Sequence, residues 1–367
     1  MAGWLKQDSF VIDLRHPLRL HDSNFTPLSR TPWAGKRISE LYKPHHRGNA
    51  IGESWEFSCD PTFPSLLPDH GCNLQELVEK YPEEILSPKL ASTMQDPTCE
   101  ILIKLLNADD PLSLQVHPED GDTALTPSEC GKPESWLVLD VEKGGGIYIG
   151  FSQDVGPDKM RSMLESNQDI KSYLQFVPVK PGDFFDIAPG LVHAIGVGVT
   201  LLEPQRIRFG KSGKTYRLWD WGRKYNKDGQ IDEKSGHPRE LHIDEGLRII
   251  DLANQVGEAF VNSVRRFPEK KQIEGCLWES YPANDYYQVH ILSGKAHKRK
   301  LSFQDGYVAL IPLAGEGTIL TGTDTSTNVK AGHPMLLPAV MGSCEISLSV
   351  DARCALVLPS MAVLEFS

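Results

Sequence analysis

The chain has 367 residues, of which 40% are hydrophobic and 24% are charged, values typical of a globular protein with a full core. Its net charge of −11 would repel a phosphate backbone, and no Lys/Arg-rich run offsets that charge, which argues against nucleic-acid binding. No stretch approaches the roughly 18 uninterrupted apolar residues that a spanning helix needs, so we expect no membrane partner.

The first residues of the sequence and the cysteines indicate the cellular compartment in which we expect the protein. Residues 1–8 include lysine and aspartate and lack the apolar run of a secretory signal. The seven cysteines are odd in number, scattered and never spaced as Cys-x-x-Cys, which is typical of reduced thiols rather than of a disulfide framework or a thiolate metal site. We therefore expect a cytoplasmic protein.

Helical signals are few. In chain order, the first lies near residues 73–95, where Asn73 and Glu76 form a capping-box pattern ahead of apolar positions. The second covers residues 156–174, with Met160, Met163 and Leu164 at helical spacing. The third covers residues 244–253 and begins with an aspartate. These segments predict a small helical annex.

Short strand-like runs bounded by Gly, Pro, Asn and Asp dominate from residue 99 to residue 221 and again from about residue 262 to the end. In the first block they are Cys99–Leu106, Leu112–His117, Ser135–Asp140, Gly146–Gly150, Asp183–Ala188, Val199–Glu203 and Thr215–Trp221. In the second they are Tyr287–Leu292, Tyr307–Pro312, Gly317–Thr321, Pro334–Pro338, Cys344–Val350 and Cys354–Leu358. Two such sets favour two β-sandwiches or barrels over βαβ units.

The fold class predicted is thus mainly β, with two domains. We expect an N-terminal domain over residues 1–255 and a C-terminal domain over residues 262–367. A polar loop is expected over residues 224–240, and a linker near residues 256–268 separates the two blocks. The chain shows no residue-level repeat and no low-complexity tract.

One strand carries two candidate metal ligands. Side chains alternate along a strand, so Gln115 and His117 share one face of residues 112–117 with Ser113, and the other face is aliphatic: Leu112, Leu114 and Val116. Glu134 opens another strand-like run, and His193 follows a Pro-Gly turn. Gln, His, Glu and His together make a candidate mixed nitrogen and oxygen site for a divalent metal.

The motifs resemble those of a known family. Residues 180–193, KPGDFFDIAPGLVH, resemble the second motif of cupins, which delivers one histidine into the barrel, whereas the usual His-x-His of the first motif is replaced by Gln115-Val-His117. The series LSLQVHP, GKPESW, VHAIG and TYRLWDWGR resembles the type I mannose-6-phosphate isomerases, as do RELHID at residues 239–244 and GESWE at residues 52–56. Each match alone is weak, but six in family order between about residues 33 and 253 make chance improbable.

The resemblance implies two cupin-type jelly-roll domains, the first catalytic and the second metal-free. It implies one Zn²⁺ per chain, bound by Gln115, His117, Glu134 and His193. It also implies that Lys104, Lys132 and Arg217 surround the sugar phosphate, to which we add Glu56 of the GESWE motif as a substrate-binding residue. The expected reaction interconverts mannose 6-phosphate and fructose 6-phosphate by moving a proton through an enediolate.

Three departures from the family pattern stand out. Ala-Pro-Gly at residues 188–190 replaces the usual Pro-Ala-Gly before His193. Residues 203–215 form a segment longer than in the short bacterial members, with extra basic residues. The C-terminal block keeps the cupin-like run VKAGHPMLLP at residues 329–338 without a histidine at the ligand position.

The proton-transferring group is left open. We expect Arg217, Lys132 and Lys104 to be catalytic, with Arg217 or a lysine handling the proton and Glu56 third, although arginine is a poor base at its usual pKa and an electrostatic role is equally credible. Each residue also has a structural interpretation: Lys104 as the solvent-side residue of its strand, Lys132 as a turn lysine, Arg217 as a salt-bridge partner.

Two other functions compete with the isomerase. An Fe²⁺-dependent cupin dioxygenase would favour His-rich ligation, and the Gln in place of His speaks against it. A non-catalytic module that senses sugar phosphates would keep the pocket without turnover. We expect the protein to be a monomer or a weak homodimer.

Overall fold

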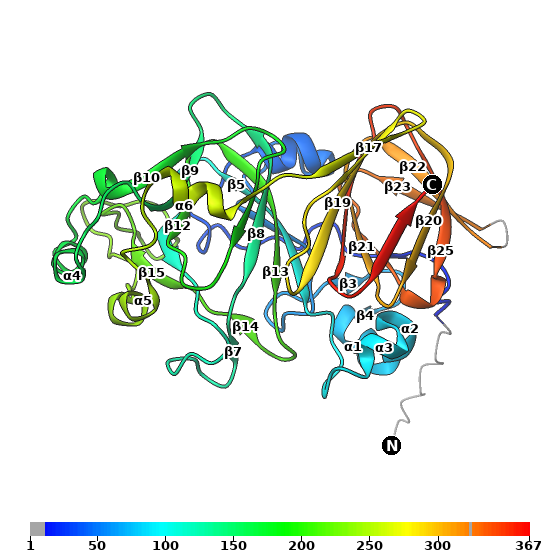
Figure 1. Ribbon diagram of the computed structural model, residues 1–367, viewed down its shortest axis with the longest axis horizontal. Coiled ribbons are helices and arrows are strands. Elements are labelled where there is room, and N and C mark those ends of the chain that lie inside the picture. Colours follow the sequence, from blue (N-terminus) through cyan, green and yellow to red (C-terminus); the bar gives the residue numbers. More distant parts are fainter. Residues whose placement is uncertain (1–11, 323–324) are drawn as a thin grey trace, which may run out of the picture.

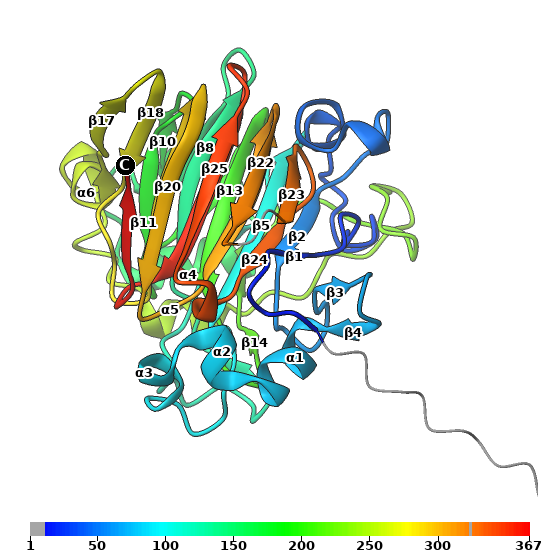
Figure 2. The ribbon, with the colours of Figure 1, turned by 90° about the vertical axis from the view of Figure 1, so that its right-hand side faces the viewer.

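The structure, a computed structural model, describes residues 12–322 and 325–367 (Figure 1). The prediction that residues 1–8 carry no secretory signal lies outside this part. Four large sheets stack face to face along the long axis of the molecule, two in each half (Figures 1 and 2). Each sheet ends in edge strands, so the halves are open sandwiches. The prediction of a mainly β protein with two sandwiches is confirmed.

The first half contributes the outermost sheet and the sheet next to it. The outer sheet has the order β10 (Leu174–Pro178), β9 (Gly146–Phe151), β12 (His193–Ile195), β6 (Leu114–Val116), β15 (Tyr216–Trp219). The inner sheet has the order β16 (Arg265–Arg266), β11 (Phe184–Ile187), β8 (Glu134–Val141), β13 (Val199–Arg206), β5 (Ile101–Ala108), β2 (Glu53–Phe57).

The second half adds two more layers. Its inner sheet has the order β1 (Leu18–Arg19), β24 (Met335–Leu337), β21 (Val308–Ala314), β26 (Arg353–Pro359), β19 (Tyr287–Gly294), β18 (Cys276–Ser280), β17 (Glu269–Ile273). Its outer sheet has the order β23 (Thr325–Lys330), β22 (Glu316–Thr321), β25 (Ser343–Leu348), β20 (Ala296–Gln304), β27 (Val363–Phe366). Two small sheets pair β3 (Leu66–Leu67) with β4 (Cys72–Asn73) and β7 (Glu129–Cys130) with β14 (Ser212–Gly213).

The two inner sheets pack against each other, which makes β5 and its neighbours buried on both faces. Leu105 and Leu202 lie in one apolar cluster with Val289 and Ile311 of the second half. All eight residues of β5 are buried. This explains why β5 reads as a near-continuous apolar run in which Lys104 is an exception: the strand has no solvent side.

The helices are shorter than predicted. The capping box of Asn73 and Glu76 is present at α1 (Leu74–Lys80), but the predicted 73–95 segment is three helices, with prolines at the starts of α2 (Pro82–Leu86) and α3 (Pro88–Ala91). The α4 helix (Pro157–Glu165) ends well before residue 174, because the following residues form a 3₁₀ turn, η3 (Lys171–Tyr173), and then β10 beside β9. The third predicted helix is α5 (Ile243–Ile249).

The short helical turns complete the element list. They are η1 (Ile38–Tyr42), η2 (Pro44–His46) and η4 (Ala339–Met341), the last of which packs on α2. The predicted polar loop over residues 224–240 is irregular, with isolated bridges only.

Strands near the ends of the first half connect the two halves. The predicted linker, residues 256–268, holds the helix α6 (Gly257–Val264), which packs on β9, β10 and β11, and β16, which pairs with β11. Near the start of the chain, β1 pairs with β24 of the second half, Leu18 opposite Leu336. The domain boundary between residues 255 and 262 stays a prediction.

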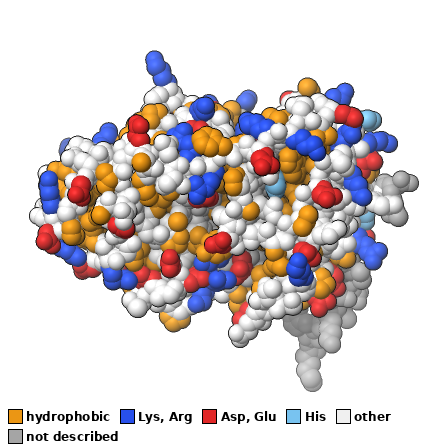
Figure 3. All heavy atoms as spheres, viewed as in Figure 1, with side chains coloured by type: hydrophobic (Ala, Val, Ile, Leu, Met, Phe, Trp, Pro, Cys, Tyr) orange, Lys and Arg blue, Asp and Glu red, His pale blue; other side chains and the backbone are white. Residues whose placement is uncertain are grey.

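The helices, the cysteines and the surface charges of the described part can be compared with what the composition predicts. No helix among the described residues is long and apolar enough to cross a membrane. All seven cysteines lie in the described part and are free thiols, six of them buried. On the face shown in Figure 3, basic and acidic side chains are interspersed.

A buried ion pair lies where the two halves meet, and it predicts a large stability effect. Lys43 Nζ lies 2.7 Å from Glu56 Oε2 and donates to the carbonyl of Gly332 at 2.8 Å. Replacing Lys43 by Met leaves the carboxylate buried and unpaired, so we expect a loss of about 3–5 kcal/mol in the free energy of unfolding, measured by urea denaturation. The control Lys89→Met breaks an exposed pair with Asp305 and should cost less than about 1 kcal/mol. Equal effects of the two variants would contradict this.

A buried histidine of the second half predicts acid sensitivity. Burial lowers the pKa of His290 from 6.5 to about 4. Below pH 6.5 the unfolded chain binds a proton that the folded chain does not, so this residue makes stability fall between pH 6.5 and about 4, by roughly 3 kcal/mol. Urea denaturation across this range should show a smaller fall for His290→Gln, whereas His297→Gln, at an exposed position, should behave as the wild type.

Candidate metal centre and adjoining cleft

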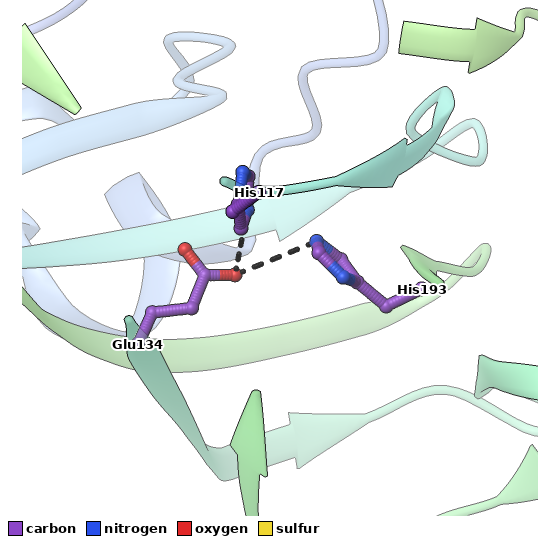
Figure 4. A group of neighbouring side chains, drawn as sticks. All are labelled: His117, Glu134 and His193. Atoms are coloured by element: carbon purple, nitrogen blue, oxygen red, sulfur yellow. Dashed lines mark ion pairs between the residues drawn. The ribbon is translucent and has the colours of Figure 1, made fainter. Parts of the chain in front are cut away.

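Three of the predicted ligands converge between the two sheets of the first half (Figure 4). Glu134 opens β8, His193 opens β12, and His117 directly follows β6. Glu134 Oε1 lies 3.4 Å from His117 Nε2 and 3.6 Å from His193 Nε2, and both imidazoles point toward this one oxygen. All three side chains are buried. The antiparallel pairing of His193 with Gln115 sets the register that brings β12 and β6 together.

Hydrogen bonds orient both imidazoles. Nδ1 of His117 faces the carbonyl of Lys214 at 3.1 Å, and Nδ1 of His193 faces the carbonyl of Leu191 at 2.9 Å. A carbonyl only accepts, so Nδ1 is the protonated nitrogen and the Nε2 lone pair of each ring faces the carboxylate. Buried His193 Nε2 has no hydrogen-bond partner. Oriented imidazoles with an unsatisfied nitrogen beside a carboxylate fit a divalent metal such as Zn²⁺.

The charges around the ligands keep the histidines neutral and the carboxylate ionised. Burial lowers the pKa of His193 to about 3, and burial followed by the Lys132 ammonium lowers the pKa of His117. Burial alone would raise the pKa of Glu134, but the Lys132 ammonium, with Nζ at 2.6 Å, holds it well below its usual range. These are the protonation states in which the groups bind a metal.

Gln115 lies beside the three ligands at the mouth of a small cavity. A space of about 10 Å³, close to the volume that one water occupies, is lined by Gln115, Glu134 and His193 among others. The amide nitrogen of Gln115 donates to Ser113 Oγ at 3.0 Å, which leaves its oxygen available. Leu112, predicted on the opposite face, also lines this cavity, because β6 begins only at Leu114.

The small cavity adjoins a cleft of about 400 Å³, lined mainly by polar side chains from both sheets and from several loops. Lys104, Lys132, Arg217 and Gln115, all predicted site residues, line it. A larger cavity, about 580 Å³, lies between α3 and the second half, and none of the metal ligands lines it. The chemistry-bearing groups therefore gather at the smaller cleft.

Two lysines and two glutamates form a buried network on the cleft floor. Glu203 Oε1 lies 3.4 Å from Lys104 Nζ and 3.7 Å from Lys132 Nζ, and Glu203 Oε2 accepts from Trp136 Nε1 at 3.2 Å. Burial and the nearby Glu134 raise the pKa of Glu203. Burial opposes the charge of Lys132, but Glu134 and Glu203 raise its pKa. Lys132 is therefore an ammonium at neutral pH.

Arg217 lines the cleft beside Gln115. Its backbone pairs with Gln115, its Nε donates to Ser113 Oγ at 3.3 Å, and its Nη1 donates to the carbonyl of Glu240 at 3.0 Å. Burial and then the nearby Arg239 lower its pKa. The guanidinium thus stands in the cleft with donors held by neutral acceptors.

The structure does not bring Glu56 to the cleft. Strand alternation places Glu53 and Trp55 on the cleft side of β2, whereas Glu56 points toward the second half, where Lys43 pairs with it and Ser54 donates to it at 2.6 Å. The substrate-binding role predicted for Glu56 has no geometric support.

Sequence reasoning missed Glu53 and Glu203. Glu53 accepts from Thr26 and Trp55 at 3.1 and 3.0 Å, and although burial opposes it, Lys104 lowers its pKa. The predicted strand ends at Glu203, but β13 continues to Arg206. The alternation of Glu203 and Gln205 on one face of a strand was the available signal.

Known proteins resemble this chain in sequence and in fold. No family model matches the chain. Mannose-6-phosphate isomerase ManA of Bacillus subtilis is 31% identical over 330 residues, which cover 88% of this chain and 93% of the relative. A crystal structure of the mannose 6-phosphate isomerase from Bacillus subtilis matches with a TM-score of 0.74 at 22% identity, over 93% of this chain and 99% of that one. A different crystal structure of a mannose 6-phosphate isomerase, described as holo and zinc bound, matches with a TM-score of 0.69 at 16% identity, over 94% of this chain and 100% of that one.

The solved structures show a shared fold, two cupin-type sandwiches over nearly the whole chain. The sequence match to the Bacillus subtilis relative is the stronger finding, because it passes 30% identity over most of both chains. The resemblance of the six motifs is thus confirmed at the level of the whole sequence, and the chain belongs to the mannose-6-phosphate isomerase family.

Proposed function

We propose that this chain is a zinc-dependent aldose–ketose isomerase that interconverts mannose 6-phosphate and fructose 6-phosphate. The observation that carries the proposal is the convergence of His117, Glu134 and His193 at one end of a polar cleft that also holds lysine and arginine side chains. Family membership supports the substrate, and a relative's structure described as zinc bound supports the metal.

His117, Glu134 and His193 would hold one Zn²⁺ per chain, with Gln115 as the fourth ligand. Two neutral imidazoles, an amide and one carboxylate leave a net positive charge, so bound zinc would act as a Lewis acid on a carbonyl or hydroxyl oxygen. An amide oxygen is the weakest donor of this set, so Gln115 is the ligand best suited to give way to substrate.

The isomerisation moves one proton between C1 and C2 of the sugar through an enediolate. Glu203 is the candidate base, because it lines both the small cavity and the cleft, accepts hydrogen bonds from Lys104 and Trp136, and lies 3.7 Å from the Lys132 ammonium. Lys132 supplies a fixed positive charge beside it, and Lys104, which stacks on Trp55 at 4.5 Å, supplies a second. Arg217 acts electrostatically and binds the phosphate, since its donors suit an anion and not a base.

Other properties follow from the same proposal. The seven free thiols fit a reducing, cytoplasmic compartment. The substrate partner is a small sugar phosphate, and we propose no nucleic-acid or membrane partner. A monomer or weak homodimer is proposed because the site is built from one chain.

Chelation separates the proposal from its rivals. A coupled assay should detect conversion of mannose 6-phosphate to fructose 6-phosphate, lose it after a strong chelator, and regain it with Zn²⁺. Activity lost in the variant His193→Gln together with bound zinc would support the ligand assignment. Iron found after anaerobic purification, with O₂ uptake, would support a dioxygenase, and zinc binding without turnover would support a sensor.

Conservative substitutions separate the base from the electrostatic groups. Glu203→Gln keeps the hydrogen-bonding shape but removes the base, so we expect kcat to fall by about 10²–10⁴ while zinc content stays normal. Arg217→Ala should raise KM more than it lowers kcat. The control Glu279→Gln removes a carboxylate of the second half that pairs with Lys270. Normal turnover in Glu203→Gln would remove it from the proton transfer.

A further inference from the structure

Positive charge in the cleft is balanced at one end and unbalanced at the other. Lys104 and Lys132 have carboxylate partners in Glu134 and Glu203. Arg217, by contrast, donates only to a hydroxyl and a carbonyl within the described part of the chain. A cation without a carboxylate partner is suited to bind an anion from outside.

Arg239 lines the same cleft and is held there rigidly. Its Nε and Nη2 donate to the two oxygens of Asp220 at 2.7 and 2.8 Å, and its guanidinium lies over the ring of Tyr225 at 5.0 Å from the centroid. Because one edge of the planar Arg239 guanidinium is fixed by Asp220, the N–H groups on its other edge point in one direction. The side chain of Arg239 is 21% exposed, so these donors are accessible to a ligand.

Asp220 is itself a buried, fixed group. It is 4% exposed and also accepts from Arg223 Nη2 at 2.7 Å, and Arg223 in turn donates to the carbonyl of Pro111 at 2.8 Å. Pro111 precedes Leu112, which lines the cleft. The carboxylate is thus tied to the cleft wall, and the loop that carries Arg239 is tied to the carboxylate.

We propose that Arg239 is a second phosphate-binding residue beside Arg217, and that Asp220 is a positioning residue that holds Arg239 in the cleft. This rests on the proposed isomerase function. Arg217 and Arg239 line the same cleft, and Asp220, the carboxylate that pairs with Arg239, also pairs with Arg223. Two guanidinium groups with donors left over suit a phosphate dianion.

The arrangement also explains why two arginines stand together without a ligand. The like charges of Arg217 and Arg239 repel, as the lowered pKa of Arg217 indicates. Asp220 offsets this repulsion by pairing with Arg239 from behind and leaves Arg217 without a carboxylate. An anion between the two guanidinium groups would be attracted to both. Discrimination between a sugar phosphate and a free sugar would then depend on Arg239.

Kinetics on one variant tests the role of Arg239. For Arg239→Gln we expect KM for mannose 6-phosphate to rise about 10- to 100-fold, with kcat within about threefold of wild type. The inhibition constant of inorganic phosphate should rise by the same factor. Arg239→Lys, which keeps the charge but cannot form the two-point contact with Asp220, should fall between these values. KM and the phosphate inhibition constant both within twofold of wild type would overturn the proposal.

Asp220→Asn tests the positioning role. It should raise KM and the phosphate inhibition constant about fivefold without changing kcat, a split that general destabilisation would not produce. The control is Arg248→Gln, which breaks another Arg–Asp pair outside the cleft, in which Nη2 of Arg248 contacts both oxygens of Asp122. It should leave KM unchanged, and a KM rise equal to that of Asp220→Asn would overturn the positioning role.

A binding measurement keeps this inference separate from the isomerase assignment. Inorganic phosphate should raise the melting temperature of the wild-type holoprotein and fail to do so for Arg239→Gln. This result does not depend on turnover. A wild-type protein that binds phosphate through Arg239 but does not isomerise mannose 6-phosphate would contradict the proposed function alone.

Discussion

The first half of the molecule is organised around one buried carboxylate. Glu134 starts β8 between two sheets, where an unpaired negative charge would cost several kcal/mol. It is compensated on one side by the ammonium of Lys132 at 2.6 Å, and on the other side the Nε2 lone pairs of His117 and His193 face it. The strand register and both histidine orientations follow from keeping these groups around a single oxygen. A dication at this position would complete the compensation.

The second half contributes to this site without touching it. Its inner sheet covers the outer face of β5, β8 and β13, so those strands are apolar on that face. Their other face is free to carry Lys104, Glu134 and Glu203. A sheet with water on its outer face would need its apolar residues on the inner one. The polar floor of the cleft thus depends on a partner sheet to which it contributes no ligand.

The sequence predicted the group His117, Glu134 and His193, which the structure brings together, better than the shape of the cleft. These residues lie in or directly beside strands whose polar residues interrupt apolar runs, a local pattern that can be read from one chain. Glu203 was missed because its strand runs through a proline, which usually ends a strand.

Arg239 illustrates a different limit. It lies in an irregular loop, and its position depends on Asp220 and Tyr225, contacts that no periodicity reveals. The predicted helix over residues 156–174 was too long for a related reason. Leu174 has helical spacing, but its backbone pairs with Phe151 of β9 instead. In both cases contacts with distant parts of the chain override the local pattern.

The pairing of an early strand with a late one bears on how the chain is made. Strand β1 finds its neighbour, β24, only after synthesis has passed well into the second half. The first sandwich likewise lacks its β16 edge until translation has passed the α6 helix. The newly synthesised chain therefore carries an unpaired β1 until β24 has been made. The pairing of β1 with β24 is then a late step in forming the native topology.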